Sequence, residues 1–194
     1  MNIEEILQND GVYIYENGVW RRLEVEGPYI PLENGVYIIY FRNRMCAGCK
    51  NFDYIWRRFI DVFNKGFGKP VLIQCTDFFY NCNSQSASNS FIFYLVFSTP
   101  QVIVAIIEDG IPIYIERETY FENVESLESF VYGVYERKKV FESQPIEEEE
   151  SEGIYIDLSN RNWKEVVEKI KKMVFEGKNI REICNENICR IILE

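Results

Sequence analysis

Two cysteines separated by two residues, Cys46 and Cys49, are the residues of this chain whose type and spacing best suit chemistry. Residues 35–41 (GVYIIYF) form an unbroken apolar run before them, which is typical of a strand buried on both faces. Apolar residues then recur at three- and four-residue steps from Phe52 to Phe63, which predicts an amphipathic helix of about 15 residues. Cys46 is therefore expected where a buried strand passes into the N-terminus of a helix.

A cysteine sulfur at that position is stabilised as an anion. The unpaired backbone N–H groups of a helix N-terminus carry about half a positive charge, and Arg42, Arg44 and Lys50 add positive charge nearby. The pKa of a free thiol, about 8.5, falls by one to several units in such surroundings. The thiolate is the attacking species in disulfide exchange. We therefore expect an accessible Cys46 to attack, and Cys49, one helical turn further on, to resolve the mixed disulfide.

The pair Cys46 and Cys49 also admits two other interpretations. One is half of a structural zinc site, which needs four ligands. The sequence has no histidine, so the other half would have to come from a second cysteine pair, and neither remaining pair has the same spacing. The other interpretation is a plain structural pair. We favour the redox interpretation and expect no metal.

The remaining four cysteines form two local pairs, which are candidates for structural disulfides. Cys75 ends an apolar run and can remain a core residue, bond to Cys82 across the intervening loop, or join it as a second redox pair. Cys184 and Cys189 flank a predicted tight hairpin with Glu186-Asn187 at its tip, which places the two sulfurs opposite each other. We expect this last pair to be structural.

The elements that position these cysteines suggest four segments along the chain. An N-terminal β extension (residues 1–31) contains a hairpin around Asn17-Gly18, a dipeptide that favours hairpin turns. A main domain (32–142) is predicted to be α/β, with strand, helix and strand forming a parallel unit. An acidic linker (143–153) leads to a C-terminal βα appendage (154–194), which is expected to pack on the main domain or on a partner.

Apolar periodicity and turn residues predict the other elements. They are a strand over residues 71–75, a loop over 77–90, a compact helix over 91–97, an antiparallel pair over 102–107 and 112–117, a helical face over 124–134, a strand over 154–158 and a helix over 163–175.

The order of these elements around the cysteines resembles the thioredoxin-like family of disulfide oxidoreductases. The resemblance covers residues 33–135 and depends on the strand GVYIIYF, the motif CAGC, the strand VLIQC, the tripeptide Ser98-Thr99-Pro100 and the hairpin VIVAIIEDGIPIYI. It implies a three-layer fold with a mixed central sheet. It also implies that the Thr99–Pro100 bond is cis and faces the cysteines, and that the backbone of Thr99 pairs with a bound substrate strand.

The resemblance also implies site residues and shows departures. Met45, Thr99 and Pro100 would contact the substrate, and no organic cofactor is implied, because electrons travel through the thiols themselves. Met45 stands where family members often have Trp, and Ala47-Gly48 lacks the proline frequent inside the motif. Tyr40 stands where thioredoxins place a buried acid, so the acid–base helper of Cys49 is either missing or supplied by another residue.

The composition limits the other function classes. The chain has 194 residues, with 21 Lys+Arg against 31 Asp+Glu and a formal net charge of -10, which disfavours nucleic acid as a partner. The absence of histidine excludes Ser-His-Asp and Cys-His catalysis. No apolar run reaches the roughly 18 residues of a membrane span, and the acidic N-terminus is unlike a signal peptide. We expect a cytoplasmic protein without a membrane partner, and the Ile, Tyr, Glu and Lys content leans towards a thermophile.

These observations together predict a thiol-disulfide oxidoreductase that acts on protein substrates or on a redox partner. The alternative is a non-catalytic module of the same fold that serves binding or homodimerisation. In that alternative the cysteines would form structural disulfides.

Overall fold

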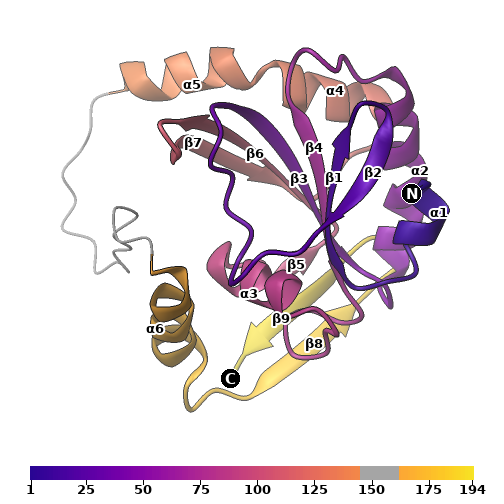
Figure 1. Cartoon of the computed structure of the whole chain (residues 1–194). Coiled ribbons are helices and arrows are strands. Elements are labelled where there is room, and N and C mark those ends of the chain that lie inside the picture. Colours follow the sequence, from indigo (N-terminus) through magenta and orange to yellow (C-terminus); the bar gives the residue numbers. More distant parts are fainter. Residues whose placement is uncertain (145–161) are drawn as a thin grey trace.

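The apolar run before Cys46 forms β3 (Gly35–Asn43), a central strand of a six-stranded mixed sheet. The computed structural model describes residues 1–144 and 162–194, and this part of the chain is a mixed α/β structure (Figure 1). The strands, in spatial order, are β2 (Val19–Leu23), β1 (Gly11–Glu16), β4 (Lys69–Cys75), β3, β6 (Gln101–Glu108) and β7 (Ile111–Glu118). β3 is parallel to β4, which confirms the predicted parallel pair, and it is antiparallel to β6.

Helices cover both faces of this sheet. The described helices are α1 (Ile3–Ile6), α2 (Ala47–Val62), α3 (Gln85–Phe93), α4 (Val124–Tyr132), α5 (Val134–Ser143) and α6 (Trp163–Phe175). On β3, Ile39 and Phe41 join the apolar cluster shared with α3, whereas Ile38 and Tyr40 join the cluster shared with α2 and α4. Successive side chains of a strand point to opposite faces, so burial of both faces explains the unbroken apolar sequence.

The N-terminal hairpin forms as predicted, and it extends the central sheet. Its turn is made by Asn17 and Gly18, with φ of 54° and 84°, a left-handed conformation that Asn and Gly tolerate. β1 also pairs antiparallel with β4, and Tyr13 and Trp20 of the hairpin are buried in the core. The hairpin of residues 11–23 therefore belongs to the same sheet as β3.

The segment between β4 and β6 corrects one prediction. Residues 85–90, predicted as loop, are the first part of α3, which begins after Ser84 and ends before the predicted helix 91–97 would. The Ser84 side chain caps the helix by accepting a hydrogen bond from the backbone N–H of Ala87. Small polar residues of α3 face the core, where Ser90 accepts a hydrogen bond from the Tyr29 backbone at 2.8 Å. Because these buried residues are polar, the sequence shows no apolar periodicity that would predict a helix there.

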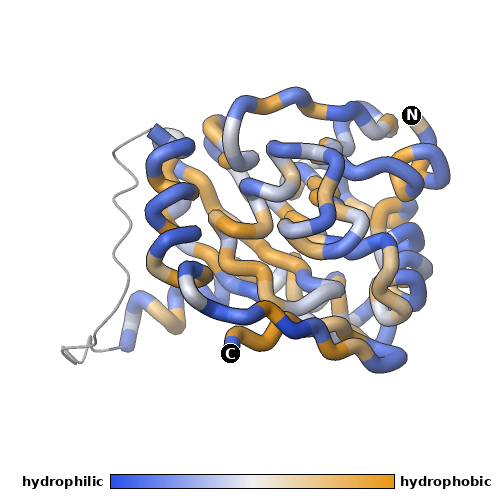
Figure 2. Tube along the Cα trace, turned by 90° about the horizontal axis from the view of Figure 1, so that it is seen from below, coloured by the Kyte–Doolittle hydropathy of each residue, from blue (hydrophilic) through white to orange (hydrophobic). Residues whose placement is uncertain are grey.

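The C-terminal elements contact the rest of the protein in two places. α6, at the predicted residues, packs on α3 through a cluster that includes Ile92, Val167 and Ile170. A hairpin of β8 (Ile180–Cys184) and β9 (Cys189–Leu193) follows, and β9 pairs antiparallel with the short strand β5 (Ser98–Thr99). Figure 1 shows this hairpin in yellow beside β5, and Figure 2 shows the hydropathy of the same chain from below.

Two predictions of the sequence analysis lie on the residues that the structure does not describe. The strand over residues 154–158 lies there entirely, and so does the linker except its first residues. Among the described helices, none has the length and apolar character needed to cross a membrane.

Candidate functional site

Cys46 is the N-cap residue of α2, as the sequence predicts. Its backbone is extended, and its sulfur accepts a hydrogen bond from the backbone N–H of Cys49 at 3.2 Å. The first turn of α2 contains no acidic residue that would oppose a negative charge. The sulfur therefore lies at the positive end of a 16-residue helix.

The Thr99–Pro100 turn lies beside this sulfur. The Thr99–Pro100 bond is cis, in agreement with the expectation, and the carbonyl oxygen of Thr99 lies 3.5 Å from the Cys46 sulfur. The Thr99 hydroxyl is buried beside the cysteines and lowers the pKa of both thiols. The structure thus brings together Cys46 and Cys49 of α2 with Thr99 of β5.

A small pocket lies next to the cysteines. Pro100, Gly48 and Phe52 line it together with Tyr120 and Asn187, and its volume is about 230 Å³. Met45, the third residue expected to contact a substrate, does not line this pocket, but its side chain is 68% exposed directly before Cys46. Met45 is therefore an exposed apolar residue directly before the cysteine pair.

The two sulfurs have opposite electrostatic environments. The pKa of the Cys46 thiol is lowered to about 6, chiefly by a hydrogen bond with the Cys49 side chain and further by the Cys49 backbone, the Thr99 hydroxyl and the Cys189 backbone, against the effect of burial. Burial raises the pKa of the Cys49 thiol well above its usual range, and the neighbouring Cys46 adds to that effect. Near neutral pH the pair is therefore a thiolate at Cys46 and a thiol at Cys49.

The accessibility expected for Cys46 is wrong for this structure, because the residue is only 1% exposed. The hairpin β8–β9 covers it. Thr99 lies opposite Cys189 in the β5–β9 pair, and the Asn51 side chain donates a hydrogen bond to the Glu186 carbonyl at 3.0 Å. The hairpin tip approaches α2 so closely that a Cβ atom on Gly48 would overlap the Asn187 carbonyl.

A buried carboxylate that the sequence analysis missed lies one turn of α2 beyond Cys49. Asp53 is 6% exposed and forms an ion pair with Arg42, whose Nη2 lies 2.7 Å from Oδ2. The Tyr40 hydroxyl donates to Asp53 Oδ1 at 3.1 Å and lies 3.2 Å from the Cys49 carbonyl oxygen. The buried carboxylate thus lies on the helix rather than on the strand. The spacing of four residues from Cys49 was the available signal, since such residues share a helix face.

A second acidic group, formed by Asp77 and Glu182 of the hairpin β8–β9, lies near Cys46. The Tyr80 hydroxyl donates to Glu182 of β8 at 2.6 Å. Burial raises the pKa of the Asp77 carboxyl to about 7, and a hydrogen bond with Glu182 and the charges of Glu182 and Cys46 contribute. Asp77 therefore retains a proton close to neutral pH.

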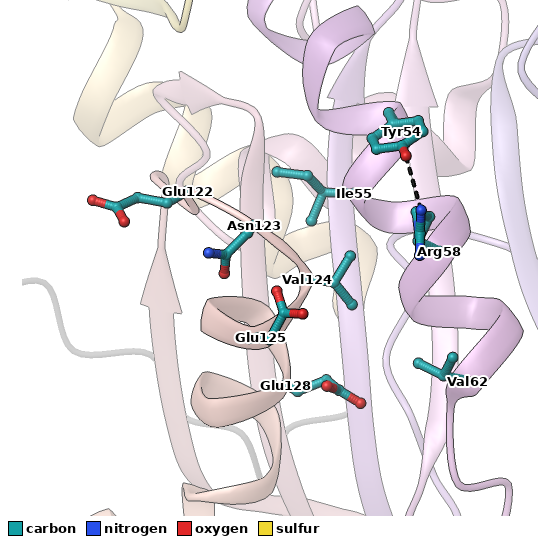
Figure 3. Close-up of a pocket in the computed structure, with 9 residues that line it drawn as sticks. All are labelled: Tyr54, Ile55, Arg58, Val62, Glu122, Asn123, Val124, Glu125 and Glu128. Carbon is teal, nitrogen blue, oxygen red and sulfur yellow. Dashed lines mark hydrogen bonds between the residues drawn. The ribbon is translucent and has the colours of Figure 1, made fainter.

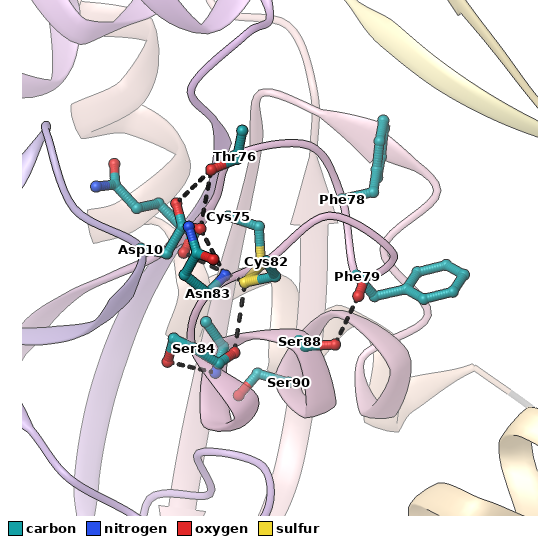
Figure 4. Close-up of a disulfide and its surroundings, with 12 residues drawn as sticks. Asp10, Cys75, Thr76, Phe78, Phe79, Cys82, Asn83, Ser84, Ser88 and Ser90 are labelled. Atoms are coloured by element: carbon teal, nitrogen blue, oxygen red, sulfur yellow. Dashed lines mark hydrogen bonds between the residues drawn. A yellow bond between two sulfur atoms is a disulfide. The ribbon is translucent and has the colours of Figure 1, made fainter.

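Both candidate structural disulfides are formed. Cys75 bonds to Cys82, and Asp10 holds the same loop by accepting hydrogen bonds from the Thr76 hydroxyl at 2.9 Å and the Asn83 backbone at 2.7 Å (Figure 4). Cys184 bonds to Cys189 directly across the hairpin β8–β9. Cys46 and Cys49 are free thiols.

A larger pocket lies between α2 and the start of α4. Its volume is about 490 Å³, and Figure 3 shows the lining residues, with the Arg58 guanidinium donating to the Tyr54 hydroxyl at 2.9 Å. Its lining includes neither Gly48 nor Pro100, which line the pocket beside the cysteines. Comparison of the chain with models of known protein families and with curated proteins finds no match.

Proposed function

We propose that this protein is a thioredoxin-like thiol-disulfide oxidoreductase that exchanges disulfides with protein substrates through Cys46 and Cys49. The observation that carries the proposal is the paired environment of the two sulfurs: Cys46 is favoured as a thiolate and Cys49 as a thiol. An attacking group must be a thiolate at working pH, and a resolving group must stay protonated until it is needed.

The arrangement of the elements supports the same proposal. A parallel β3–α2–β4 unit presents the cysteines at the strand–helix junction, and Thr99 of β5 precedes the antiparallel pair β6–β7. This is the order that the resemblance implies. The position of β9 on Thr99 also fits, because an extended strand occupies the place expected for a substrate strand.

In the proposed reaction the Cys46 thiolate attacks one sulfur of a substrate disulfide, and the other substrate sulfur leaves as a thiolate. Cys46 then carries no negative charge, which removes one of the causes that raise the pKa of the Cys49 thiol. Cys49 can now lose its proton and attack Cys46. The products are a Cys46–Cys49 disulfide and a reduced substrate, and the reverse sequence donates a disulfide.

The experiment that tests this proposal follows the reduction of a small disulfide reagent by the reduced protein. The wild type should form the Cys46–Cys49 disulfide and release both reagent thiols, whereas Cys46→Ser should release none. Cys49→Ser should stop at a mixed disulfide on Cys46, identified by its mass. Equal thiol release by the wild type and Cys46→Ser would exclude Cys46 as the nucleophile.

The 1% exposure of Cys46 favours a second candidate, a non-catalytic module for binding or homodimerisation. In that case the hairpin β8–β9 would permanently cover the cysteines. The same experiment separates the two candidates, because a non-catalytic module would leave the wild type unreactive until it unfolds.

A further inference from the structure

The disulfide of the C-terminal hairpin lies at the cysteine site itself. β9 pairs antiparallel with β5 so that Cys189 lies directly opposite Thr99, and Cys184 lies opposite Cys189 on the outer strand. Thr99 is the residue whose carbonyl oxygen lies 3.5 Å from the Cys46 sulfur. β9, which contains one cysteine of this disulfide, therefore pairs with Thr99 at the position expected for a substrate strand.

The two cysteines of this disulfide differ in their exposure to solvent. Cys189 is fully buried and belongs to the same apolar cluster as Cys46 and Cys49. Its backbone is one of the groups that lower the pKa of the Cys46 thiol. Cys184, by contrast, is exposed to solvent on β8. One cysteine of the disulfide is thus buried in the same cluster as the cysteine pair, and the other can be reached from outside.

We propose that the Cys184–Cys189 disulfide is the internal substrate of Cys46 and Cys49, and that it relays electrons between this buried pair and an external protein dithiol or disulfide. This inference rests on the proposed function. It also explains how a buried Cys46 can serve an external partner while the hairpin stays in place.

The exchange balances within the chain. The Cys46 thiolate bonds to the Cys189 sulfur, the Cys184–Cys189 bond breaks, and Cys184 leaves as a thiolate. Cys49 loses its proton and attacks Cys46, which releases Cys189 as a thiolate. The Cys46–Cys49 pair is oxidised by two electrons, and the hairpin disulfide is reduced by the same two electrons. No other oxidant or reductant is needed.

Solvent supplies the proton for the leaving sulfur, because Cys184 is exposed on β8. The Cys184 sulfur also lies 3.0 Å from Oε1 of Glu182. The Cys49 proton goes to solvent or to the released Cys189 sulfur, so both hairpin cysteines end as thiols.

The other disulfide provides a comparison within the same molecule. Cys75–Cys82 joins the end of β4 to the loop before α3, and Asp10 hydrogen bonds hold that loop (Figure 4). β9 is the partner of β5, so neither Cys75 nor Cys82 pairs with Thr99. We expect Cys75–Cys82 to remain closed while Cys184–Cys189 exchanges.

The test uses the full chain as Cys49→Ser, which removes the resolving thiol. The protein, with its hairpin disulfide formed, is incubated with iodoacetamide and mapped by mass spectrometry without reduction. The expected product is a Cys46–Cys189 disulfide with an alkylated Cys184. Cys184 should be alkylated on the order of tenfold faster than in the matched control Cys46→Ser/Cys49→Ser, which lacks the attacking thiolate. The Cys75–Cys82 peptide should stay intact in both.

Equal alkylation of Cys184 in both variants, with no Cys46–Cys189 peptide, would overturn the inference. If Cys49→Ser does not fold, the wild type provides the same test. Starting from reduced Cys46 and Cys49, it should yield a Cys46–Cys49 disulfide and two hairpin thiols, at a rate independent of protein concentration. A wild type that never yields this product would also overturn the inference.

The variant Cys184→Ser/Cys189→Ser separates failure of the inference from failure of the proposed function. If its Cys46 reduces a small external disulfide while Cys49→Ser forms no Cys46–Cys189 bond, the inference fails and the proposed function stands. If Cys46 reacts with neither disulfide, both fail.

Discussion

The Tyr40 hydroxyl donates a hydrogen bond to Asp53 at 3.1 Å, which ties the central strand to the helix that begins at the cysteines. Asp53 also pairs with Arg42, and both charged groups are almost completely buried. Removal of one partner of a buried pair leaves the other charge unpaired. This relationship holds β3 and α2 in the geometry that the cysteine pair requires.

Asp53→Asn is expected to destabilise the protein by about 3 kcal/mol, because Arg42 would remain buried without its countercharge. Urea unfolding measures the loss. The matched control is Glu4→Gln, which removes the exposed ion pair with Arg57 and should cost less than about 1 kcal/mol. Equal losses in the two variants would show that the buried pair has no special role.

Thr99→Val should raise the pKa of the Cys46 thiol from about 6, because the Thr99 hydroxyl is one of the groups that lower it. The increase should cover only part of the difference between about 6 and the ordinary thiol value, because the Cys49 side chain, which is the largest cause, remains in place. The pH dependence of Cys46 alkylation gives the measurement. Ser98→Ala on the same strand should leave the midpoint unchanged. An unchanged midpoint in Thr99→Val as well would remove Thr99 from the site.

Gly48→Ala should loosen the hairpin β8–β9, because the new methyl group would overlap the Asn187 carbonyl. Cys46 should then be alkylated on the order of tenfold faster, which corresponds to a loss of about 1.4 kcal/mol in the free energy that holds the hairpin β8–β9 over Cys46. Gly66→Ala is the control, since its nearest neighbour is an Asn64 side-chain atom at 3.4 Å. If Gly48→Ala is alkylated no faster than this control, the hairpin does not limit access to Cys46.

Asp77→Asn should change how stability depends on pH. The folded carboxyl, with its pKa raised to about 7, binds a proton that the unfolded chain releases near pH 4. Stability from this group is therefore lost as pH rises from about 4 to 7, where Asp77 ionises beside Glu182 and the Cys46 thiolate. Between pH 5 and pH 8 the wild type should lose stability relative to Asp77→Asn, as urea midpoints will show. A constant difference between the two proteins would contradict this.

The strands of the central sheet, both of its hairpins and the N-cap position of Cys46 could be predicted, because apolar periodicity and the Asn-Gly and Asp-Gly turns are local signals. The hairpin at Cys184 and Cys189 was predicted for the same reason, but its location was not. Its pairing with Thr99 joins residues far apart in the sequence, and no local pattern encodes such a contact. The burial of Cys46 follows from that pairing, so it also could not be foreseen.

Two other features were missed for different reasons. α3 was missed because Ser86 and Ser90 face the core and make hydrogen bonds there, so its buried face does not look apolar. Asp53 follows Cys49 by four residues, the spacing that places two residues on one face of a helix. The sequence therefore contained a signal for the buried acid but none for the covering hairpin.

The ionisation of Cys46 tests the central claim most directly. The ultraviolet absorbance of the thiolate is followed against pH in the wild type, with Cys46→Ser as the blank. A transition near pH 6 that disappears in Cys46→Ser is the predicted result. A transition at or above the ordinary thiol value of about 8.5, or one that persists without Cys46, would contradict the account.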